Sequence, residues 1–424
     1  MSTRSGRRTV VGTIDAGGVY CSQVAAGGGY LFLAGTAMDD HGGLAEAARP
    51  RPPYEGSAAA ESRMQTRFIF ERYRALLPQI GSSLHDLVQL EQYVKLKVHT
   101  DGYFREALGP GFMDTSRPVG ATAQVGEYFP GGAVVSVTGL GIVPDRGAGF
   151  VKEFPGRDPS KPGGQFPEMV SAGPYVFTTY YPTDSKTGIH PSVRTEDWNW
   201  RGSEIRGEAE YGVEVMKARL AIAGAALGDI VDYTLFLADP GDLYEFDLVF
   251  RSALGEPAPT RTVIPIRGLA NPRREGAFGH EQGALRMEAQ FRCLVPGRGA
   301  ARVAVPGPGD GFGYQSAGMR VGPLLWISSQ VADPAHRGGG AAPELDNIIE
   351  KIGVTCRNGH TALGNLLRLR ALVSRPVDAL AVYAALRKAV PSAPPVVCIV
   401  VIPSPLPADG CSVALDAVAY VEDA

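Results

Sequence analysis

Three stretches of the chain repeat the same order of hydrophobic and polar segments. Each stretch begins with a short apolar run that predicts a buried strand, at 30–35, 175–181 and 324–330. A loop follows, and apolar residues then recur at helical spacing. The recurring positions are Met64, Phe68, Leu76 and Ile80 in the first stretch, Val213, Met216 and Leu220 in the second, and Ile348, Ile352 and Cys356 in the third. The pattern predicts an amphipathic helix against a sheet in every stretch.

Further segments recur in the same order and give the spacing of the repeat. A helix end followed by a strand occurs at 82–98, 225–239 and 361–375, with Asp86, Asp229 and Asn365 at matching points. A short helix comes next, and an extended segment follows at 120–125, 261–266 and 396–401. These markers agree on a period of about 140 residues, which indicates three tandem copies of one domain.

Alternation of residue types predicts the faces of two strands. Val94, Leu96 and Val98 alternate with polar residues, so we expect a strand through position 98. The clearest closing strand is 284–293 in the second repeat. It sends Leu285, Met287, Ala289, Phe291 and Cys293 to one face and Arg286, Glu288, Gln290 and Arg292 to the other.

Glycine- and proline-rich segments without periodicity separate the repeats at 144–164 and 296–311. We therefore expect domains at 1–145, 165–296 and 310–424. The second repeat carries two extra loops, 189–207 with Trp198 and Trp200, and 270–283. Long loops on a regular scaffold often build pockets, although a loop tryptophan packs locally more often than it binds ligand.

The composition is that of a soluble globular protein, with 44% hydrophobic and 20% charged residues and a net charge of -3. No basic stripe predicts a nucleic-acid partner, and no apolar run approaches the roughly 20 residues of a membrane span. Five scattered cysteines fit the reduced thiols of a cytoplasmic protein. The dispersed histidines and glycine clusters lack the spacing of metal or nucleotide sites, so we expect no metal and no cofactor.

The order strand–strand–helix–strand–helix–strand–strand resembles the RidA/YjgF family. The second repeat carries the strongest likeness, in TDSKTG (183–188), AGAALGDIVDYTLFLAD (223–239) and PTRTVIPIRGL (259–269). The first repeat matches through GGVYCSQ (17–23) and HDLVQLEQYV (85–94), and the third through GYQSAG (313–318) and WISSQ (326–330). The resemblance implies an α+β fold of three tandem RidA/chorismate-mutase-like domains. They would form a single-chain pseudo-trimer with a central β-barrel-like core, helices outside and ligand clefts between neighbouring domains.

The family's arginine that binds the substrate carboxylate matches Arg261, in the second repeat. A planar guanidinium suits this role because it offers two parallel donors to a carboxylate. The first repeat has Gly120 at this position and the third has Val396. The resemblance therefore implies one competent cleft, with Thr262 beside Arg261 as a second substrate-binding residue. Without the alignment of the three repeats, Arg261 would be interpreted as a surface arginine at the start of a strand.

The family's cleft also holds a tyrosine near the N-terminus. Tyr20 matches it in the first repeat and Tyr314 in the third, whereas the second repeat has Gln165 or Phe166. Either tyrosine would join Arg261 from a neighbouring domain. The alternative is that each tyrosine fills core or interdomain space.

Two further positions of the family's cleft diverge among the repeats. The family's serine matches Ser328 in the third repeat, with Ala34 in the first and Thr178 in the second. The family's glutamate, which positions the hydrolytic water, aligns with Arg286, and Glu288 follows one step further on the same face. This departure places simple imine hydrolysis by the family's usual residues in doubt.

The arginine at the glutamate's position leaves two interpretations open. A cleft holding both Arg261 and Arg286 would suit a substrate with two anionic groups. Alternatively, Arg286 and a glutamate form a structural pair on a solvated face. Glu281 and His280, in the extra loop, are reserve acid–base candidates, or simply members of a polar loop.

The resemblance implies an enzyme that acts on a small carboxylate metabolite. The reaction would be imine or enamine hydrolysis of the deaminase type, or a related hydrolysis or rearrangement in specialised metabolism. Arg261, Glu288 and Tyr20 would be catalytic. The substrate-binding set would comprise Arg261, Thr262, Arg286, Thr178, Tyr314 and Ser328. The alternatives are a chorismatase-like hydrolase and a non-catalytic small-molecule-binding protein. We expect a monomeric pseudo-trimer or a dimer of pseudo-trimers.

Overall fold

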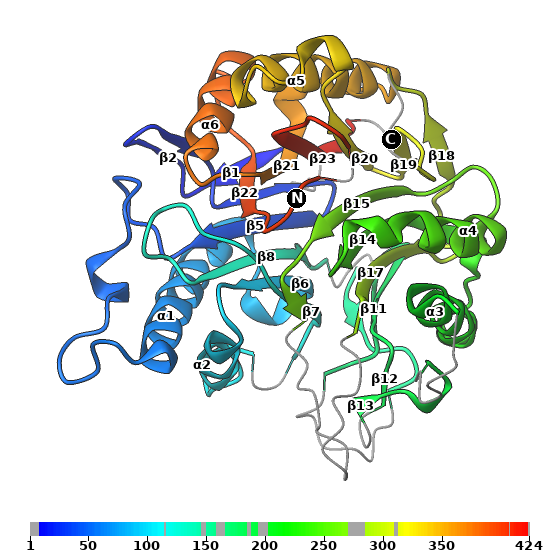
Figure 1. Ribbon diagram of the computed structural model, residues 1–424, viewed down its shortest axis with the longest axis horizontal. Helices are drawn as coiled ribbons and strands as arrows, with labels where there is room; N and C mark the ends of the chain where they lie inside the picture. Colours follow the sequence, from blue (N-terminus) through cyan, green and yellow to red (C-terminus); the bar gives the residue numbers. More distant parts are fainter. Residues whose placement is uncertain are drawn as a thin grey trace.

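Strands and helices follow one another in three rounds of the same order (Figure 1). The computed structural model describes residues 8–113, 116–145, 150–157, 166–184, 188–193, 202–269, 285–308, 313–406 and 408–422. Within these ranges the fold is mixed α+β, and each round, called a unit below, builds its own sheet with two helices. The helix pairs lie on the outside, in three different directions from the strands (Figure 1).

The three units contain matching elements. The first unit has β4 (Val24–Gly27), β5 (Tyr30–Thr36), α1 (Ala58–Leu76), β6 (Leu87–Val94), α2 (Lys97–Ala107), β7 (Val119–Gln124) and β8 (Val135–Ile142). The second has β10 (Met169–Ala172), β11 (Tyr175–Tyr180), α3 (Glu204–Ile222), β14 (Ile230–Leu237), α4 (Leu243–Leu254), β15 (Thr260–Pro265) and β17 (Met287–Leu294). The third has β19 (Gly318–Val321), β20 (Leu324–Val331), α5 (Ala341–Asn358), β21 (Leu366–Val373), α6 (Asp378–Ala389), β22 (Val396–Val401) and β23 (Val413–Tyr420).

The strand order is the same in every sheet. It is β4-β5-β8-β6-β7 in the first unit, β10-β11-β17-β14-β15 in the second and β19-β20-β23-β21-β22 in the third. The last two strands of each order run parallel, and the other neighbours run antiparallel. A parallel pair needs a crossover connection, which α2, α4 and α6 provide.

The segments between the units also contain strands. β1 (Thr9–Val11), β9 (Lys152–Glu153) and β18 (Arg302–Val305) each add an edge strand to the sheet that follows. β9 and β18 lie within the predicted linkers 144–164 and 296–311, in which the sequence showed no periodicity. Such short edge strands are held by backbone hydrogen bonds, which need no apolar periodicity.

Shorter strands complete the fold. β16 (Gly268–Leu269), from the second unit, pairs with β7 of the first sheet. Two small hairpins join β2 (Ile14–Ala16) to β3 (Val19–Cys21), and β12 (Thr183–Asp184) to β13 (Gly188–Ile189). Short 3₁₀ turns connect several of the larger elements. None of the helices in the described ranges has both the length and the apolar character to cross a membrane.

Two predictions of local structure are corrected by the described elements. The strand expected through Val98 ends at Val94, because α2 begins at Lys97 and the ring Nδ1 of His99 accepts the backbone N–H of Leu96 at 3.1 Å. Leu96 and Val98 are consequently exposed. The predicted apolar face of α1 is also displaced, since α1 buries Ile69, Phe70 and Tyr73. The helix faces predicted in the second and third repeats, by contrast, are buried as expected.

The three units contact one another in a cycle. β7 contacts β11, β15 contacts β20, and β22 contacts β5. The inner faces of all three sheets share one hydrophobic core, in which the ring of Trp326 lies 6.1 Å from Phe32 and 6.2 Å from Tyr175. The backbone ladders nevertheless form separate sheets in the described ranges, so the expected barrel-like core is not a closed barrel there.

A buried network of charged side chains lies where the three units meet. Glu91 of the first unit accepts hydrogen bonds from Arg292 of the second unit at 2.9 Å and from Arg370 of the third at 2.7 Å. Arg292 also binds Asp232 at 2.8 Å. The third unit adds Arg370 to Asp416 at 2.6 Å and Arg368 to Asp416 at 2.7 Å. Three arginines face three carboxylates, so this group is electrically balanced.

Candidate active site

The second and third units meet where β15 lies beside β20. Arg261 is the second residue of β15, and its backbone N–H donates to the Ser328 hydroxyl of β20 at 3.0 Å. That hydroxyl in turn donates to the Ser316 carbonyl. The Arg261 side chain is fully buried, with 0% of its surface exposed. This arginine is therefore an interface residue, and not a surface residue at a strand start.

The Arg261 guanidinium is surrounded by polar groups from both units. The carboxylate of Asp247, on α4, accepts hydrogen bonds from both terminal nitrogens of Arg261. Nη2 donates to Oδ2 at 3.1 Å, and Nη1 donates to Oδ1. Nη1 also lies 3.4 Å from the Tyr233 hydroxyl, and Nε lies 3.4 Å from Oε1 of Gln315. Burial alone would lower the pKa of Arg261, but Tyr233 and Asp247 raise it above its ordinary value. The guanidinium thus stays charged and already holds one carboxylate in a bidentate manner.

The third unit closes over this ion pair through the segment that carries Tyr314. The Tyr314 backbone N–H donates to Oδ2 of Asp247 at 3.0 Å, and its hydroxyl donates to the Gly255 carbonyl at the end of α4. Gly313 has a φ of +82°, and a side-chain carbon there would collide with both Arg261 and Asp247. Glycine is required at this position because the backbone lies directly against the ion pair.

Two buried polar atoms beside Ser328 have no hydrogen-bond partner within the described ranges. They are the Ser329 hydroxyl and Oε1 of Gln330, both on β20. Buried polar atoms without partners are rare and often mark a place where water or a ligand binds. β20 therefore carries two enclosed polar groups without partners among the described residues, next to Ser328 in the sequence.

Comparisons with known proteins agree with this architecture. A RutC family protein of Pyrococcus horikoshii is 28% identical over 110 residues, which is 26% of this chain and 79% of that protein. A RutC family protein of Pyrococcus abyssi matches to the same extent. The chain is built from several domains of the RutC/RidA/YjgF kind. No family model matches it.

Solved structures extend the likeness to the fold. A chorismatase crystal structure covers 79% of this chain and 93% of its own length, with 12% identity and a TM-score of 0.50. At this identity the match shows the fold alone. A member of the YjgF/YER057c/UK114 family from Mycobacterium tuberculosis covers 28% of this chain and 100% of its own, with 24% identity and a TM-score of 0.26.

Strand register gives the positions equivalent to Arg261 in the other units. Arg261, Gly120 and Val397 are each the second residue of their strand, and each pairs with the fourth residue of the strand beside it. The residue of the third unit at the arginine's position is therefore Val397, and the alignment to Val396 was one residue out of register. The second and third units keep the same spacing from the start of β14 or β21 to the start of β15 or β22, so Asp247 of α4 corresponds to Tyr383 of α6.

Of the predicted binding residues, the structure brings Arg261, Tyr314 and Ser328 together. Thr262 follows Arg261 on β15 and therefore points to the opposite face of the strand. Tyr20 lies at a different interface, between β22 and β5, where its hydroxyl donates to the Val390 carbonyl at 2.9 Å. Tyr20 and Tyr314 thus make the same kind of contact with a neighbouring unit. The Tyr20 hydroxyl donates to the carbonyl that follows α6, and the Tyr314 hydroxyl donates to the carbonyl that follows α4.

Thr178 is displaced by one residue from the position of the family's serine. Counting from the first residues of β5, β11 and β20, Ala34 and Ser328 are level with Thr179. The Thr178 hydroxyl donates to the Glu168 carbonyl at 2.7 Å. The Thr179 hydroxyl is buried and has no partner within the described ranges.

Arg286 lies far from Arg261. It precedes β17 and binds Asp242 at 2.6 and 2.9 Å, with Glu204 at 3.3 Å. Its backbone carbonyl accepts the N–H of Ala238, just beyond the end of β14, whereas Arg261 pairs with Tyr233 near the start. Four to five residues of strand correspond to about 13–17 Å along the sheet. The structure does not bring the two arginines into one cleft, and Arg286 instead forms ion pairs with acidic residues of its own unit.

Glu288 also lies away from Arg261, on the face of β17 that packs on the first unit. The next residue on that face, Gln290, donates to the Leu90 carbonyl at 2.8 Å. The Glu288 carboxyl is almost fully buried and forms no hydrogen bond or ion pair within the described ranges. Burial raises the pKa of Glu288 well above its ordinary value. Glu288 is level with Ser136 and Ala414, each being the second residue of its strand.

Some candidates cannot be placed, and others were missed. The residues outside the described ranges are His280, Glu281, Trp198, Trp200 and Gln165.

Sequence reasoning missed Asp247, although an acidic residue beside the apolar positions Leu243, Phe246 and Phe250 of a short helix was a usable signal. Tyr233 and Gln315 carried no such signal, because each stands in an ordinary position of a strand or loop.

Proposed function

We propose that the chain is a small-molecule enzyme, a hydrolase or deaminase, that binds its substrate's carboxylate at Arg261. The observation that carries this proposal is the bidentate pairing of the buried guanidinium with Asp247. A site arranged for one carboxylate fits another of the same shape. Since 16% of the Asp247 side chain is exposed and none of Arg261 is, a substrate would displace Asp247 to reach the arginine.

The surrounding groups suit hydrolysis of a 2-imino or enamine acid. With the carboxylate on Arg261, the Tyr233 hydroxyl and the Gln315 amide, which contact the guanidinium, would be the polar groups nearest to the substrate nitrogen and to a water molecule. Water adds to the imine carbon, the carbon–nitrogen bond breaks, and ammonia and a 2-oxo acid leave. The chemistry needs proton transfers but no oxidant or reductant, and the bound water supplies the oxygen.

The placement of this site rests on the arrangement of the units, and we propose that they form a single-chain pseudo-trimer with domains at 1–145, 165–296 and 310–424. Three features support the arrangement: the repeated strand order, the cyclic contacts and the charge network shared by all units. In such a ring the three interfaces are equivalent in position and different in chemistry. Arg261 stands at one interface, Val397 at the next and Gly120 at the third.

The test compares variants of the Arg261 pair in an assay of 2-oxo acid formed from enzymatically generated 2-imino acids. Replacing Arg261 by alanine should lower kcat/KM by about 100-fold or more, since charge-assisted hydrogen bonds contribute about 1.5–3 kcal/mol each. R261K should retain part of the activity, because lysine keeps the charge and loses the bidentate geometry. Arg387→Ala is the matched control. Arg387 stacks on Tyr20 at 4.7 Å in the β22/β5 interface, so R387A should leave activity nearly unchanged.

A double variant separates loss of function from loss of fold. R261V/D247V removes both charges of the pair, and Val397, which stands at the position equivalent to Arg261, is a buried valine. It should therefore fold, with a circular dichroism spectrum like that of the parent, and be inactive. Undiminished turnover in folded R261A or R261V/D247V protein would show that the site has been assigned wrongly.

A second candidate reaction is hydrolysis of an enolpyruvyl ether. It is favoured by the chorismatase fold, which covers 79% of this chain and is matched over 93% of its own length. The same variants can be assayed for pyruvate release from chorismate. If ligands with a carboxylate bind in an Arg261-dependent manner while neither reaction is detected, the chain is a small-molecule-binding protein.

A further inference from the structure

Three basic side chains occupy one repeated position at the edges of the three sheets. Lys152 and Arg302 are the first residues of β9 and β18, and each lies opposite the last residue of the neighbouring strand, β10 or β19. Arg8 comes one residue before β1 and is level with Gly27, the last residue of β4. The edge strand of each unit therefore presents a cation at the same point.

Each cation donates hydrogen bonds to backbone carbonyls of a neighbouring unit. The acceptors are the His85 and Ser116 carbonyls for Lys152, the Gly228 and Pro257 carbonyls for Arg302, and the Leu366 carbonyl for Arg8. His85 and Gly228 lie in the short turns before β6 and β14, and Leu366 begins β21. These contacts hold the edge strand of one unit against the next unit in the cycle.

The segment that carries Arg8 differs from the other two in its connection. Lys152 and Arg302 lie on chain segments that lead directly from one unit to the next, so each bonds the unit that the chain has just left. Arg8 bonds Leu366, which is 358 positions away in the sequence, and the chain between them passes through the first and second units. A short connecting segment keeps two units at a high effective concentration when their contacts loosen, whereas a long path through other units does so less well.

Residues 8–22, called the arm below, dock on the third unit. The Tyr20 hydroxyl donates to the Val390 carbonyl at 2.9 Å, and the Ser22 hydroxyl donates to the Pro394 carbonyl at 2.7 Å. The hydrophobic cluster that includes the inner faces of α5 and α6 also contains four arm residues, Ile14, Val19, Tyr20 and Cys21. Polar and apolar contacts of the arm therefore bind the first unit to the third.

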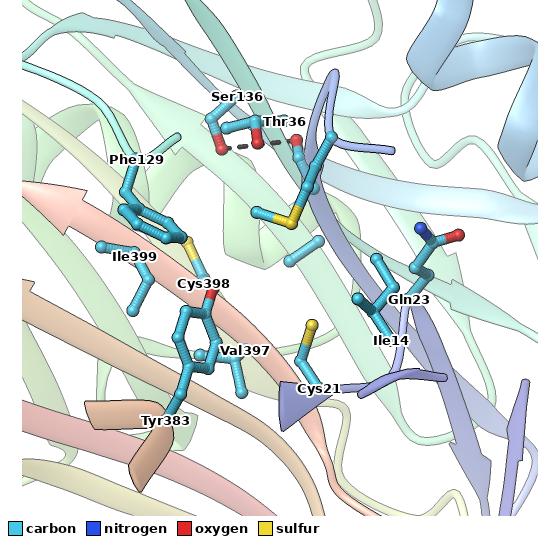
Figure 2. Close-up of a pocket in the computed structure, with 13 residues that line it drawn as sticks. Ile14, Cys21, Gln23, Thr36, Phe129, Ser136, Tyr383, Val397, Cys398 and Ile399 are labelled. Atoms are coloured by element: carbon cyan, nitrogen blue, oxygen red, sulfur yellow. Dashed lines mark hydrogen bonds between the residues drawn. The ribbon is translucent and has the colours of Figure 1, made fainter. Parts of the chain in front are cut away.

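Two features make the Arg8 contact weaker than its equivalents. In the described ranges Arg8 donates to one carbonyl, whereas the other two cations each donate to two, and Nη2 of Arg8 is buried without a hydrogen-bond partner there. Figure 2 shows a small pocket between the arm and the third unit, lined by Cys21 on one side and by Tyr383 and Val397 on the other. Incomplete packing forfeits van der Waals contacts that would otherwise hold the arm in place.

We propose that the arm is a latch, and that the cycle of units opens between the third and first units before it opens at either other interface. Opening there exposes the arm and the end of α6 together. It leaves the β15/β20 interface, with the Arg261 pair, closed. The open form returns to the same arrangement because the chain segments at 143–168 and 295–317 still join the other units in order.

Hydrogen–deuterium exchange of the full chain, measured by mass spectrometry, reports such local opening. Arg8→Ala should raise the exchange rates of the arm and of residues 390–398 together. We expect an increase of at least about tenfold, as for the loss of one hydrogen bond to a charged group. Arg302→Ala is the matched control, because it removes the equivalent contact at an interface that a chain segment spans directly. R302A should raise exchange near 302–305 and leave residues 255–262 like the parent.

A second variant tests the latch without removing a charge. Y20F deletes the hydroxyl that binds the Val390 carbonyl, and it should raise exchange in the same two segments as R8A. The proposal is overturned if the arm exchanges like the parent in folded R8A and Y20F proteins. It is also overturned if R302A loosens residues 255–262 as much as R8A loosens residues 390–398, or if R8A raises exchange equally throughout the chain.

Discussion

Replacing Glu91 by glutamine should destabilise the whole protein, because Glu91 is the carboxylate that the first unit contributes, within the described ranges, to the buried charge network. Its carboxylate accepts from Arg292 at 2.9 Å, Arg370 at 2.7 Å, Tyr93 at 2.8 Å and Thr234 at 3.1 Å. Glutamine has nearly the same shape. The amide nitrogen of the glutamine, however, would face the N–H donors of the arginines. Three arginines would then share two carboxylates, so one arginine would be left without a counter-charge. Breaking a buried ion pair in this way costs about 3–5 kcal/mol.

The pH dependence of Glu91 gives a second signature. Burial alone would raise the pKa of Glu91, but Arg370 and Arg292 outweigh burial and lower it far below its ordinary value. A carboxylate with a lowered pKa contributes stability above the pKa of the unfolded chain and loses it as the pH falls towards the folded value. The stability of E91Q should therefore fall less steeply than that of the parent as the pH is lowered.

Urea unfolding at neutral pH, followed by circular dichroism, measures the effect. The double variant E91Q/R370Q leaves two arginines facing two carboxylates, so it should cost less than the sum of the single variants by at least about 1 kcal/mol. Asp346→Asn is the control. The Asp346–Lys388 pair is largely exposed and should contribute at most about 1 kcal/mol. If E91Q costs no more than D346N, or if E91Q and R370Q are additive, the network does not join the units as proposed.

Two further carboxyls should show the opposite pH dependence, because burial raises their pKa. Burial raises the pKa of Glu208 to about 8, against the smaller opposing effect of the backbone N–H groups of Arg286 and Met287. The folded state therefore holds this proton, and stability declines as the pH rises from the ordinary glutamate range through about 8. Glu208→Gln should remove that decline in urea unfolding between about pH 5 and about pH 9. A slope unchanged from the parent would contradict this assignment. Glu288→Gln should likewise stabilise the chain at alkaline pH, where the parent must ionise a buried carboxyl whose pKa burial has raised. If E288Q is no more stable than the parent at about pH 9, Glu288 is not held protonated.

The repeat and its elements could be predicted from the sequence because they depend on local patterns. Apolar runs mark the strands, and helical spacing marks α3 and α5, whose predicted faces are buried. The first helix deviates because it buries Gln65 and Thr66. The Gln65 side chain accepts the Val134 N–H at 2.8 Å and donates to the Gly132 carbonyl at 3.0 Å. A polar residue with such a structural role cannot be recognised from hydrophobicity.

The candidate site could be predicted only in part, because its residues come from different units. The repeat alignment located Arg261, Tyr314 and Ser328, since each occupies a fixed place in its strand or loop. It did not show that α4 supplies Asp247, or that Glu288 faces a different interface. The first fact depends on how α4 packs on β15 within the second unit, and the second on how the units are placed around one another. No local pattern encodes either placement. The shift from Thr178 to Thr179 similarly required the strand register.

The charge network also decides which partners a unit can accept. The first unit contributes Glu91 and therefore one net negative charge. The second contributes Asp232 and Arg292, which cancel. The third contributes Arg368 and Arg370 with Asp416, and therefore one net positive charge. A ring of three first units would gather three uncompensated carboxylates, and a ring of three third units would gather three surplus guanidinium charges. Both assemblies would be strongly disfavoured in a buried environment. The divergence of the units would thus disfavour rings built from three copies of the first unit or of the third.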